Sequence, residues 1–407
     1  MGFNLYSILP AMWIKDALTC GPVVFCTTKH LEAYPIEPRE DAKGVARVAR
    51  QFRDLRGEPL DRLGLSLVAT DSVEDAAREG LPRMCRDALA LCHITAGTMR
   101  NCQHKARTAV CNWDYFEALP IRFRHERLLI DRPGLGAIVR FADYQPTLAT
   151  HLGTPRECEF VLDQYLFAAF NGATRAVLQG RRLRELRQLF RSVALAVQAT
   201  RLFRETYTQD FDLTPHVVAW TAAFETLVHG TDEYVGLNEV LDLVARIRWR
   251  DPSSTKVSAC RTPAGGLTDA TPPVMRKTAQ IKHYENAPSA FYRRLHQLRN
   301  DLAHGNRIDS ANFPASPGTE DGWRVDEIAP LLFRECVLER FRDLGIITRV
   351  RDGEVDDSNM RLYVEELLAT WDYHESFADA IAAADAAETP VADGPGTHPA
   401  EGDTHAL

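Results

Sequence analysis

The chain has 407 residues, of which 45% are hydrophobic and 26% are charged, so its composition is that of a globular protein and its length favours two domains. It contains no run of about 18 apolar residues and no basic, apolar signal at its start, which argues against a membrane-spanning helix and against secretion. The formal net charge is −8, but seven acidic residues and no Lys or Arg follow residue 374, so the rest is nearly balanced.

The nine cysteines are odd in number and irregularly spaced, which is typical of reduced thiols in a cytoplasmic protein. One stretch could in principle gather metal ligands, namely Cys92, His93, Cys102, His104 and Cys111. It lacks a C-x-x-C pair, and a helical or strand setting would separate the side chains. We therefore interpret these residues as buried or incidental thiols, and predict neither a metal nor a cofactor.

Residues 1–165 predict a mixed α/β domain, which we interpret as a sensor or regulatory domain. Residues 4–14 and 21–28 are short runs of apolar or β-branched residues, broken by Pro and Gly. The segment 127–141 predicts two strands joined by a turn at Pro133 and the following Gly. The predicted fold class is α+β, with this β-rich domain ahead of an all-α bundle.

Residues 166–373 predict the helical domain. Residues 175–204 carry eight arginines and one acidic residue. Such a segment either binds nucleic acid or pairs its arginines with acids elsewhere, and the abundance of Asp and Glu favours pairing. Thr214 and Pro215 are typical of a helix start, and the apolar residues that follow have helical spacing.

The segment 251–287 is rich in Pro, Ser, Thr and Gly, and predicts a loop insertion. A large helix is predicted over 325–345, a small hairpin over 347–355 and a helix over 358–371. Residues 374–407 consist largely of Ala, Pro, Gly and acidic residues, a composition that cannot build a core. We therefore predict a disordered acidic tail.

The stretch "SAFYRRLHQLRNDLAHGNRI", residues 289–308, predicts a short amphipathic helix with Ser289 as its N-cap and Gly305 just after its end. At 100° per residue, four apolar residues form a narrow stripe of the kind that packs against other helices. These are Phe291, Leu295, Leu298 and Leu302.

The other side of this helix carries His296, Asn300 and His304, with Arg299 on the shoulder of the stripe. Arg299 and His304 are about 140° apart on a regular helix, so their side chains diverge. Polar residues in a last turn are often ordinary capping chemistry. The combination of Arg-Asn, Leu-Ala and His-Gly at 299–305, at the end of one short helix, favours a functional interpretation.

"LRNDLAHG" resembles the signature of the HEPN superfamily, whose ribonucleases carry an Arg, four to six intervening residues and a His. Here Arg299 and His304 enclose four residues, and Asn300 directly after the Arg matches the commonest version. Upstream, "W-x-x-x-F-E-x-L" at 220–227 is similar to the Apea-like branch, which is found in bacterial and phage-conflict genes. The resemblance covers about 175–345.

The resemblance implies a HEPN-like bundle and a metal-independent RNA endonuclease, acting as a toxin or as an abortive-infection, antiphage effector. Arg299 would bind the scissile phosphate, His304 would act as acid or base, and Asn300 would orient it. The products would be a 2′,3′-cyclic phosphate and a 5′-hydroxyl. One motif supplies one histidine, whereas a C2 homodimer through the motif helix supplies two across a shared cleft.

Glu225 matches an acidic position often seen near such sites, although a solvated or Arg-paired Glu explains it equally well. His296 could extend the polar face, and the predicted contacts to the RNA backbone come from Arg293, Arg294 and Arg307. The expected partners are RNA, with tRNA as one candidate, and a phage-derived or regulatory protein as trigger.

A non-catalytic HEPN module is the alternative, binding RNA, a nucleotide or a partner protein in a defence complex. A weaker option is a helical half that serves only for oligomerisation.

Overall fold

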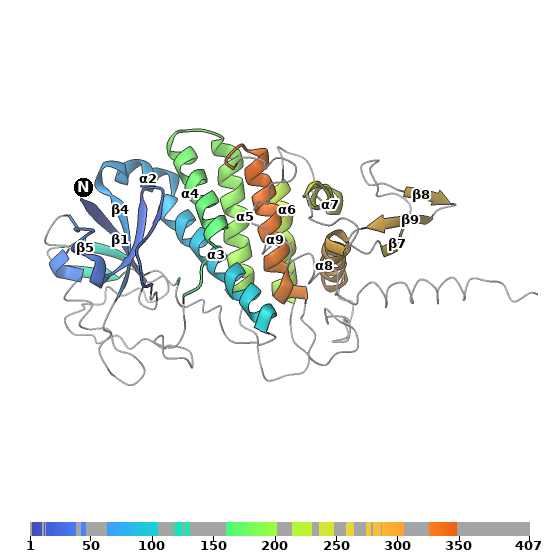
Figure 1. Cartoon of the computed structure of the whole chain (residues 1–407), viewed down its shortest axis with the longest axis horizontal. Coiled ribbons are helices and arrows are strands. Elements are labelled where there is room, and N and C mark those ends of the chain that lie inside the picture. The colour runs from blue at the N-terminus through green and yellow to red at the C-terminus, as the bar shows by residue number, and fades with distance from the viewer. Residues whose placement is uncertain are drawn as a thin grey trace, which may run out of the picture.

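The computed structural model is an α+β protein, mostly helical, with an antiparallel sheet near the N-terminus (Figure 1). This confirms the predicted class at that level. The structure describes residues 2–9, 12, 14–37, 42–45, 63–104, 116, 119–124, 127–130, 160–201, 214–229, 236–247, 258–263, 274–277, 280–285, 287–304 and 325–347.

The N-terminal sheet has the strand order β2-β3-β4-β1-β5-β6, and the neighbouring strands are antiparallel. The predicted run at 21–28 contains β3, and the run at 4–14 covers all of β1 except Phe3. The first half of the predicted 127–141 hairpin is β6, which pairs with β5, and the other half lies outside the described residues. The strands are β1 (Phe3–Leu9), β2 (Leu18–Cys20), β3 (Val23–Thr27), β4 (Gly64–Ala69), β5 (Leu119–Arg124) and β6 (Arg127–Ile130).

Both faces of the central strands are buried. Val23 and Phe25 of β3 join the core shared with the helices, whereas Val24 and Cys26 join a second apolar cluster on the other face. This alternation is the period of two expected of a strand. It explains why β3 and β4 read as continuous apolar runs.

The helices form a layered bundle beside the sheet. In Figure 1, α3, α4, α5, α6 and α9 run alongside one another, and α7 and α8 are seen nearly end-on at the end far from the sheet. The helices are α2 (Val73–Glu79), α3 (Leu81–His104), α4 (Gln164–Leu178), α5 (Leu183–Arg201), α6 (Thr214–Val228), α7 (Leu237–Arg246), α8 (Ala287–Ala303) and α9 (Val325–Asp343).

One hydrophobic core extends across the predicted domain boundary at 165/166. Helix α3 precedes that boundary in the chain, yet it packs against α4, α5 and α9 behind it. The core is continuous from Leu9 of β1 through Phe170 of α4 to Phe341 of α9. The division into domains therefore stays a prediction, and the predicted tail at 374–407 lies outside the described residues.

The predicted loop insertion at 251–287 contains strands. β7 (Ser258–Pro263), β8 (Val274–Lys277) and β9 (Gln280–Glu285) form an antiparallel sheet in the order β7-β9-β8. Apart from Pro252, which precedes β7, the Pro and Gly residues that suggested an irregular loop lie at the end of β7 or between β7 and β8 in the sequence. Turn-forming residues separate the strands of a sheet as commonly as they form long loops.

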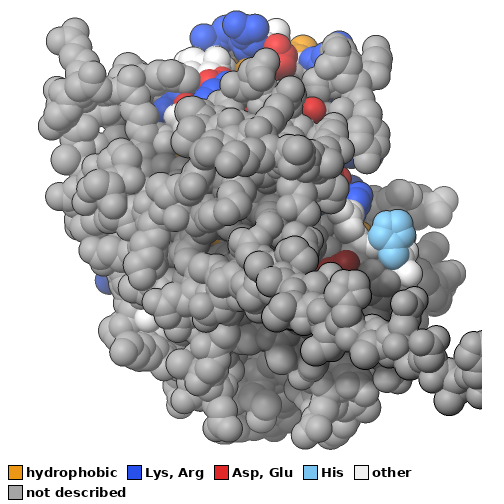
Figure 2. All heavy atoms as spheres, turned by 90° about the vertical axis from the view of Figure 1, so that its right-hand side faces the viewer, with side chains coloured by type: hydrophobic (Ala, Val, Ile, Leu, Met, Phe, Trp, Pro, Cys, Tyr) orange, Lys and Arg blue, Asp and Glu red, His pale blue; other side chains and the backbone are white. Residues whose placement is uncertain are grey.

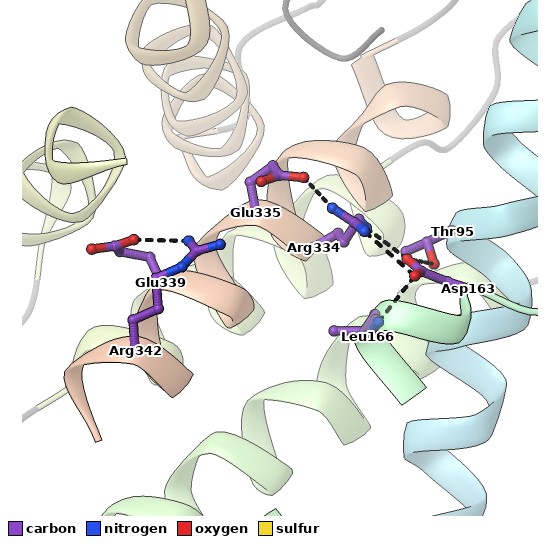
Figure 3. A network of polar contacts seen from close by, with 7 residues as sticks. All are labelled: Thr95, Asp163, Leu166, Arg334, Glu335, Glu339 and Arg342. Atoms are coloured by element: carbon purple, nitrogen blue, oxygen red, sulfur yellow. Dashed lines mark hydrogen bonds and ion pairs between the residues drawn. The ribbon is translucent and has the colours of Figure 1, made fainter. Parts of the chain in front are cut away.

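A buried ionic network joins three helices at the centre of the bundle (Figure 3). Arg334 of α9 donates from Nε to Asp163 Oδ2 at 2.6 Å and also pairs with Glu335. Asp163 is the N-cap of α4, where it accepts from the backbone N–H of Leu166, and Thr95 of α3 donates to it at 3.4 Å. Because each carboxylate has a cationic partner, these charges are tolerated in the core.

Within the described parts of the chain, no helix is both long and apolar enough to cross a membrane. Six cysteines have side chains that the structure describes, and all six are free and buried. Burial raises the pKa of the Cys26 thiol to about 12, so that this side chain stays a neutral thiol. The thiols of Cys85, Cys92 and Cys336 are shifted in the same direction, chiefly by burial.

Candidate functional site

The motif helix α8 spans Ala287–Ala303, which confirms the predicted helix. Ser289, predicted as its N-cap, lies two residues after the helix start and is buried. The predicted stripe is core, because Phe291, Leu295 and Leu298 are at most 1% exposed. The fourth member, Leu302, is partly buried against the same core.

Helix α6 sets the position of the acidic candidate. It begins at Thr214, as predicted, and its Trp220 and Phe224 are buried. The ring of Phe224 lies 5.0 Å from that of Tyr292 on α8 and packs edge-on against Phe333 of α9. This aromatic contact fixes how α6 meets α8, and the next residue, Glu225, consequently faces the polar side of α8.

Four of the predicted site residues meet there, in a group that we call the α6–α8 cluster: Glu225, His296, Arg299 and Asn300. Glu225 Oε2 lies 3.8 Å from Arg299 Nη2, and its Oε1 lies 3.7 Å from His296 Nε2. Arg299 Nη1 donates to Asn300 Oδ1 at 2.9 Å. The Asn300 amide Nδ2 is 3.3 Å from His296 Nδ1, which closes the ring of contacts.

These contacts define the protonation of His296. An amide nitrogen only donates, so His296 Nδ1 accepts from Asn300 and Nε2 carries the hydrogen that faces Glu225. Burial, aided by Arg299 and Arg293, lowers the pKa of His296 to about 4. At neutral pH the ring is therefore neutral, and it orients its neighbours rather than carrying a proton to be donated.

The pKa of Glu225 is shifted upward, opposite to that of His296. Burial raises the pKa of its carboxyl group, and the Arg299 guanidinium partly opposes that shift. The side chain is 19% exposed and that of Arg299 is 33% exposed, so the pair lies at the edge of solvent. A weak ion pair of nearly 4 Å leaves the Arg299 guanidinium able to turn toward an incoming anion.

Tyr292 is a member of this region that we did not predict from the sequence. Its side chain is fully buried, and its hydroxyl has no hydrogen-bond partner among the described residues. Burial and the negative charge of Glu225 raise its pKa well above the usual value. The only signal in the sequence was a tyrosine beside the apolar stripe, one residue after Phe291, which by itself also fits ordinary packing.

His304 lies apart from the cluster. It follows the last residue of α8 and is exposed, and its backbone N–H donates to Asn300 O at 3.0 Å. That bond is the i to i−4 bond of a regular helix, so the last turn does not unwind. Arg299 contacts Glu225 and Asn300, whereas His304 is exposed just after the helix, about 140° from Arg299 on a regular helix.

The three arginines predicted to contact RNA differ in accessibility. Arg293 is 7% exposed, so in this chain it faces other protein groups rather than solvent, where a phosphate contact would need it. Its positive charge instead acts on His296. Arg294 is partly exposed, and Arg307 lies outside the described residues.

The Cys–His stretch at 92–111 lies mainly on α3. His93 is buried, and its Nδ1 is 2.8 Å from the backbone oxygen of Val161. Cys92 and Cys102 are buried in the core, whereas the side chains of His104 and Cys111 lie outside the described set. Among the described residues, no three His, Cys, Asp or Glu side chains are grouped as a metal site would require.

No family model matches the chain, and neither a curated protein nor a solved structure matches it. The case for function therefore depends on the geometry of the α6–α8 cluster and of His304.

Proposed function

We propose that the protein is a metal-independent RNA endonuclease built on a HEPN-like bundle, acting in the cytoplasm as a toxin or antiphage effector. The observation that carries this proposal is the environment of Arg299. A half-buried carboxylate and an asparagine hold its guanidinium at the edge of solvent, at the end of a helix that also presents an exposed histidine.

The α6–α8 cluster suits a phosphate-binding role. Glu225 and Asn300 fix the guanidinium plane of Arg299, and a fixed guanidinium can bind two phosphate oxygens at once. His296, neutral at pH 7, holds Asn300 without adding a competing charge. In the transition state, Arg299 would stabilise the extra negative charge on the phosphorane.

His304 supplies the proton transfer in this proposal. RNA cleavage by the 2′-hydroxyl needs a base for the nucleophile and an acid for the 5′ oxygen leaving group, giving a 2′,3′-cyclic phosphate and a 5′-hydroxyl. One chain presents one such histidine, and it diverges from its own Arg299. A homodimer through α8 would provide two histidines and two arginines around one phosphate.

The second candidate is a HEPN-like module that binds RNA, a nucleotide or a partner protein without cleaving it. The neutral state of His296 favours this candidate over an enzyme that would use both motif-helix histidines as acid and base. In the binding module, Arg299 would bind an anion and His304 would take no part in proton transfer. In either case the N-terminal sheet would sense or restrain the bundle.

The test is cleavage of tRNA or total RNA in EDTA by the wild type, His304→Ala and Arg299→Ala. We expect the wild type to release 2′,3′-cyclic phosphate ends and each variant to lose at least about a hundredfold in rate, as is usual for loss of an acid–base group. His229→Ala is the matched control, because His229 is also an exposed histidine directly after a helix.

Retention of cleavage by both variants would exclude this site as the catalytic one. RNA binding without cleavage by the wild type, lost in Arg299→Ala, would support the binding module instead. Sedimentation of the wild type at the assay concentration measures its oligomeric state, which the mechanism requires to be a dimer.

A further inference from the structure

Helix α5 carries a row of arginines that the proposed mechanism does not use. Arg184, Arg187 and Arg191 recur at helical spacing and all three are exposed. The row extends about 10 Å along the helix, given a rise of 1.5 Å per residue. We call these three residues the α5 row.

The sequence favoured an interpretation in which these arginines pair with acids, and the structure only partly agrees. Arg187 pairs with Glu79 at 2.5 Å but keeps 52% of its side chain exposed. Arg184 and Arg191 have no ion pair with any residue that the structure describes, and neither has Arg181 in the turn before α5. Arg182 pairs with Glu185 at 3.6 Å.

This end of the bundle is therefore locally positive in a chain of negative net charge. Figure 2 views the molecule from the side of α7 and α8, and Lys and Arg side chains gather at its top. The α4–α5 turn is the topmost element in Figure 1, which shares the vertical axis of that view. Exposed cations concentrated in one place attract polyanions more strongly than their average suggests.

Contacts between α5 and α6 fix how the two helices face each other. Gln188 of α5 donates to the backbone oxygen of Thr226 at 2.8 Å, and Ser192 donates to that of Ala223 at 2.7 Å. Residue numbers rise along α5 as they fall along α6, so the two helices are antiparallel neighbours.

The α5 row and Glu225 lie on the same face of this helix pair. Arg187 and Arg191 each precede, by one residue, an α5 residue that contacts α6. Glu225 likewise precedes Thr226, which contacts α5. In two antiparallel helices, the residue that precedes a contact residue by one position points to the same side of the helix pair in both helices. Glu225 in turn contacts Arg299 of α8.

The α5 row and the α6–α8 cluster thus share one face, with α6 between them. Neighbouring helix axes lie about 8–10 Å apart. The α6 residues on that face include Val218, which is 41% exposed, and the small Ala222, which is partly exposed. Neither of these two α6 side chains is long enough to separate the two arginine groups.

We propose that this face is an RNA-binding surface, on which the α5 row contacts backbone phosphates of the strand whose scissile phosphate is held at Arg299. This inference rests on the proposed function, since it takes RNA as the ligand. The ligand class follows from the residues, because arginine matches phosphate oxygens with two parallel N–H groups. Arg184 and Arg191 offer such groups on either side of Arg187, which Glu79 holds. The contacts of the α5 row carry no base recognition, so they add affinity without sequence preference.

The experiment measures binding of a labelled single-stranded RNA and of tRNA by fluorescence anisotropy, using the full chain with His304→Ala to prevent cleavage. In that background Arg184→Gln/Arg191→Gln removes two exposed charges that have no ion pair with any described residue. We expect Kd to rise roughly tenfold at 0.1 M salt, and the slope of log K against log salt to become shallower by about 1.4, or about 0.7 per phosphate contact.

The matched control is Lys15→Gln/Lys43→Gln in the same background, which removes the same charge from exposed positions in the N-terminal region. Three outcomes would overturn the proposal. The arginine variant could keep the RNA affinity of the parent protein, both variants could lose affinity equally, or the parent protein could fail to bind RNA. The proposal would also be overturned if the arginine variant lost binding to a poly-glutamate peptide but kept its RNA affinity. That result would make an acidic protein segment the ligand of the α5 row.

Failure of the proposed nuclease activity is a separate result. If the wild type never cleaves RNA but the arginine variant alone loses RNA affinity, the surface stands without the enzyme. If the wild type cleaves RNA, and Arg184→Gln/Arg191→Gln neither weakens RNA binding in the His304→Ala background nor slows cleavage when His304 is present, the enzyme stands without the surface.

Discussion

Two arginine–carboxylate groups in the same bundle have opposite properties. Arg334 is 0% exposed and contacts Asp163 through two nitrogens, at 2.6 and 3.4 Å. Arg299 is one-third exposed, and its contact with Glu225 is 3.8 Å long. The first arginine holds three helices together, whereas the second is held in place by its neighbours and keeps donors directed to solvent.

The difference teaches how to separate structural from functional charge in a chain with many arginines. A buried pair costs desolvation energy, which only close and complete pairing offsets, so it cannot release its cation to a ligand. A pair at the edge of solvent contributes little to stability and can exchange one anion for another. By this criterion the α6–α8 cluster is available for chemistry and the network in Figure 3 is not.

The largest expected effect comes from breaking the buried network. Arg334→Ala leaves Asp163 and Glu335 buried without their cation, so the free energy of unfolding should fall by about 3–5 kcal/mol. Urea denaturation measures this loss. Arg246→Ala, which removes an arginine that is 51% exposed and paired with Asp343 at 3.3 Å, should change stability by less than about 1 kcal/mol. Equal losses in the two variants would contradict the distinction drawn here.

The corresponding change in the α6–α8 cluster should affect stability much less. Arg299→Ala is expected to lower the free energy of unfolding by less than about 1 kcal/mol, because the pair is long and partly hydrated. A double-mutant cycle with Glu225→Gln should give a coupling energy below the same limit. A coupling of several kcal/mol would place this pair with the structural network and weaken its candidacy as a site.

The last effect concerns pH. The pKa of His296 is lowered from 6.5 to about 4, so below pH 6.5 the unfolded chain takes up a proton that the folded chain refuses. Wild-type stability should therefore decline as pH falls from about 6.5 to 4, through this residue among others. Glu225, Arg299 and Arg293 surround it and are common to all variants.

The stability of His296→Gln should decline less than that of the wild type over that range, because the variant lacks the ring whose pKa burial lowers. Urea midpoints at pH 7 and pH 4.5 measure the difference. Parallel curves for the wild type and His296→Gln would show that the ring is not protected from protonation.

Local patterns predicted several elements well. The apolar period placed Phe291, Leu295 and Leu298 in the core, and Thr214 marked the start of α6, because both signals act within a few residues of the chain. The pairing of Glu225 with Arg299 could only be suspected, since it depends on how α6 packs against α8. The same local patterns did not find the strands of 258–285, whose pairing joins residues far apart in the segment.

The sequence by itself determined the motif helix, its buried stripe and the divergence of Arg299 from His304, since all three follow from the geometry of one helix. Tertiary packing was needed to show that Arg293 is buried and that Arg184 and Arg191 have no ion pair with a described residue. It also decided that α3 shares its core with helices beyond the predicted boundary. Burial and ion pairing depend on groups that are distant in the chain, and a helical period cannot contain that information.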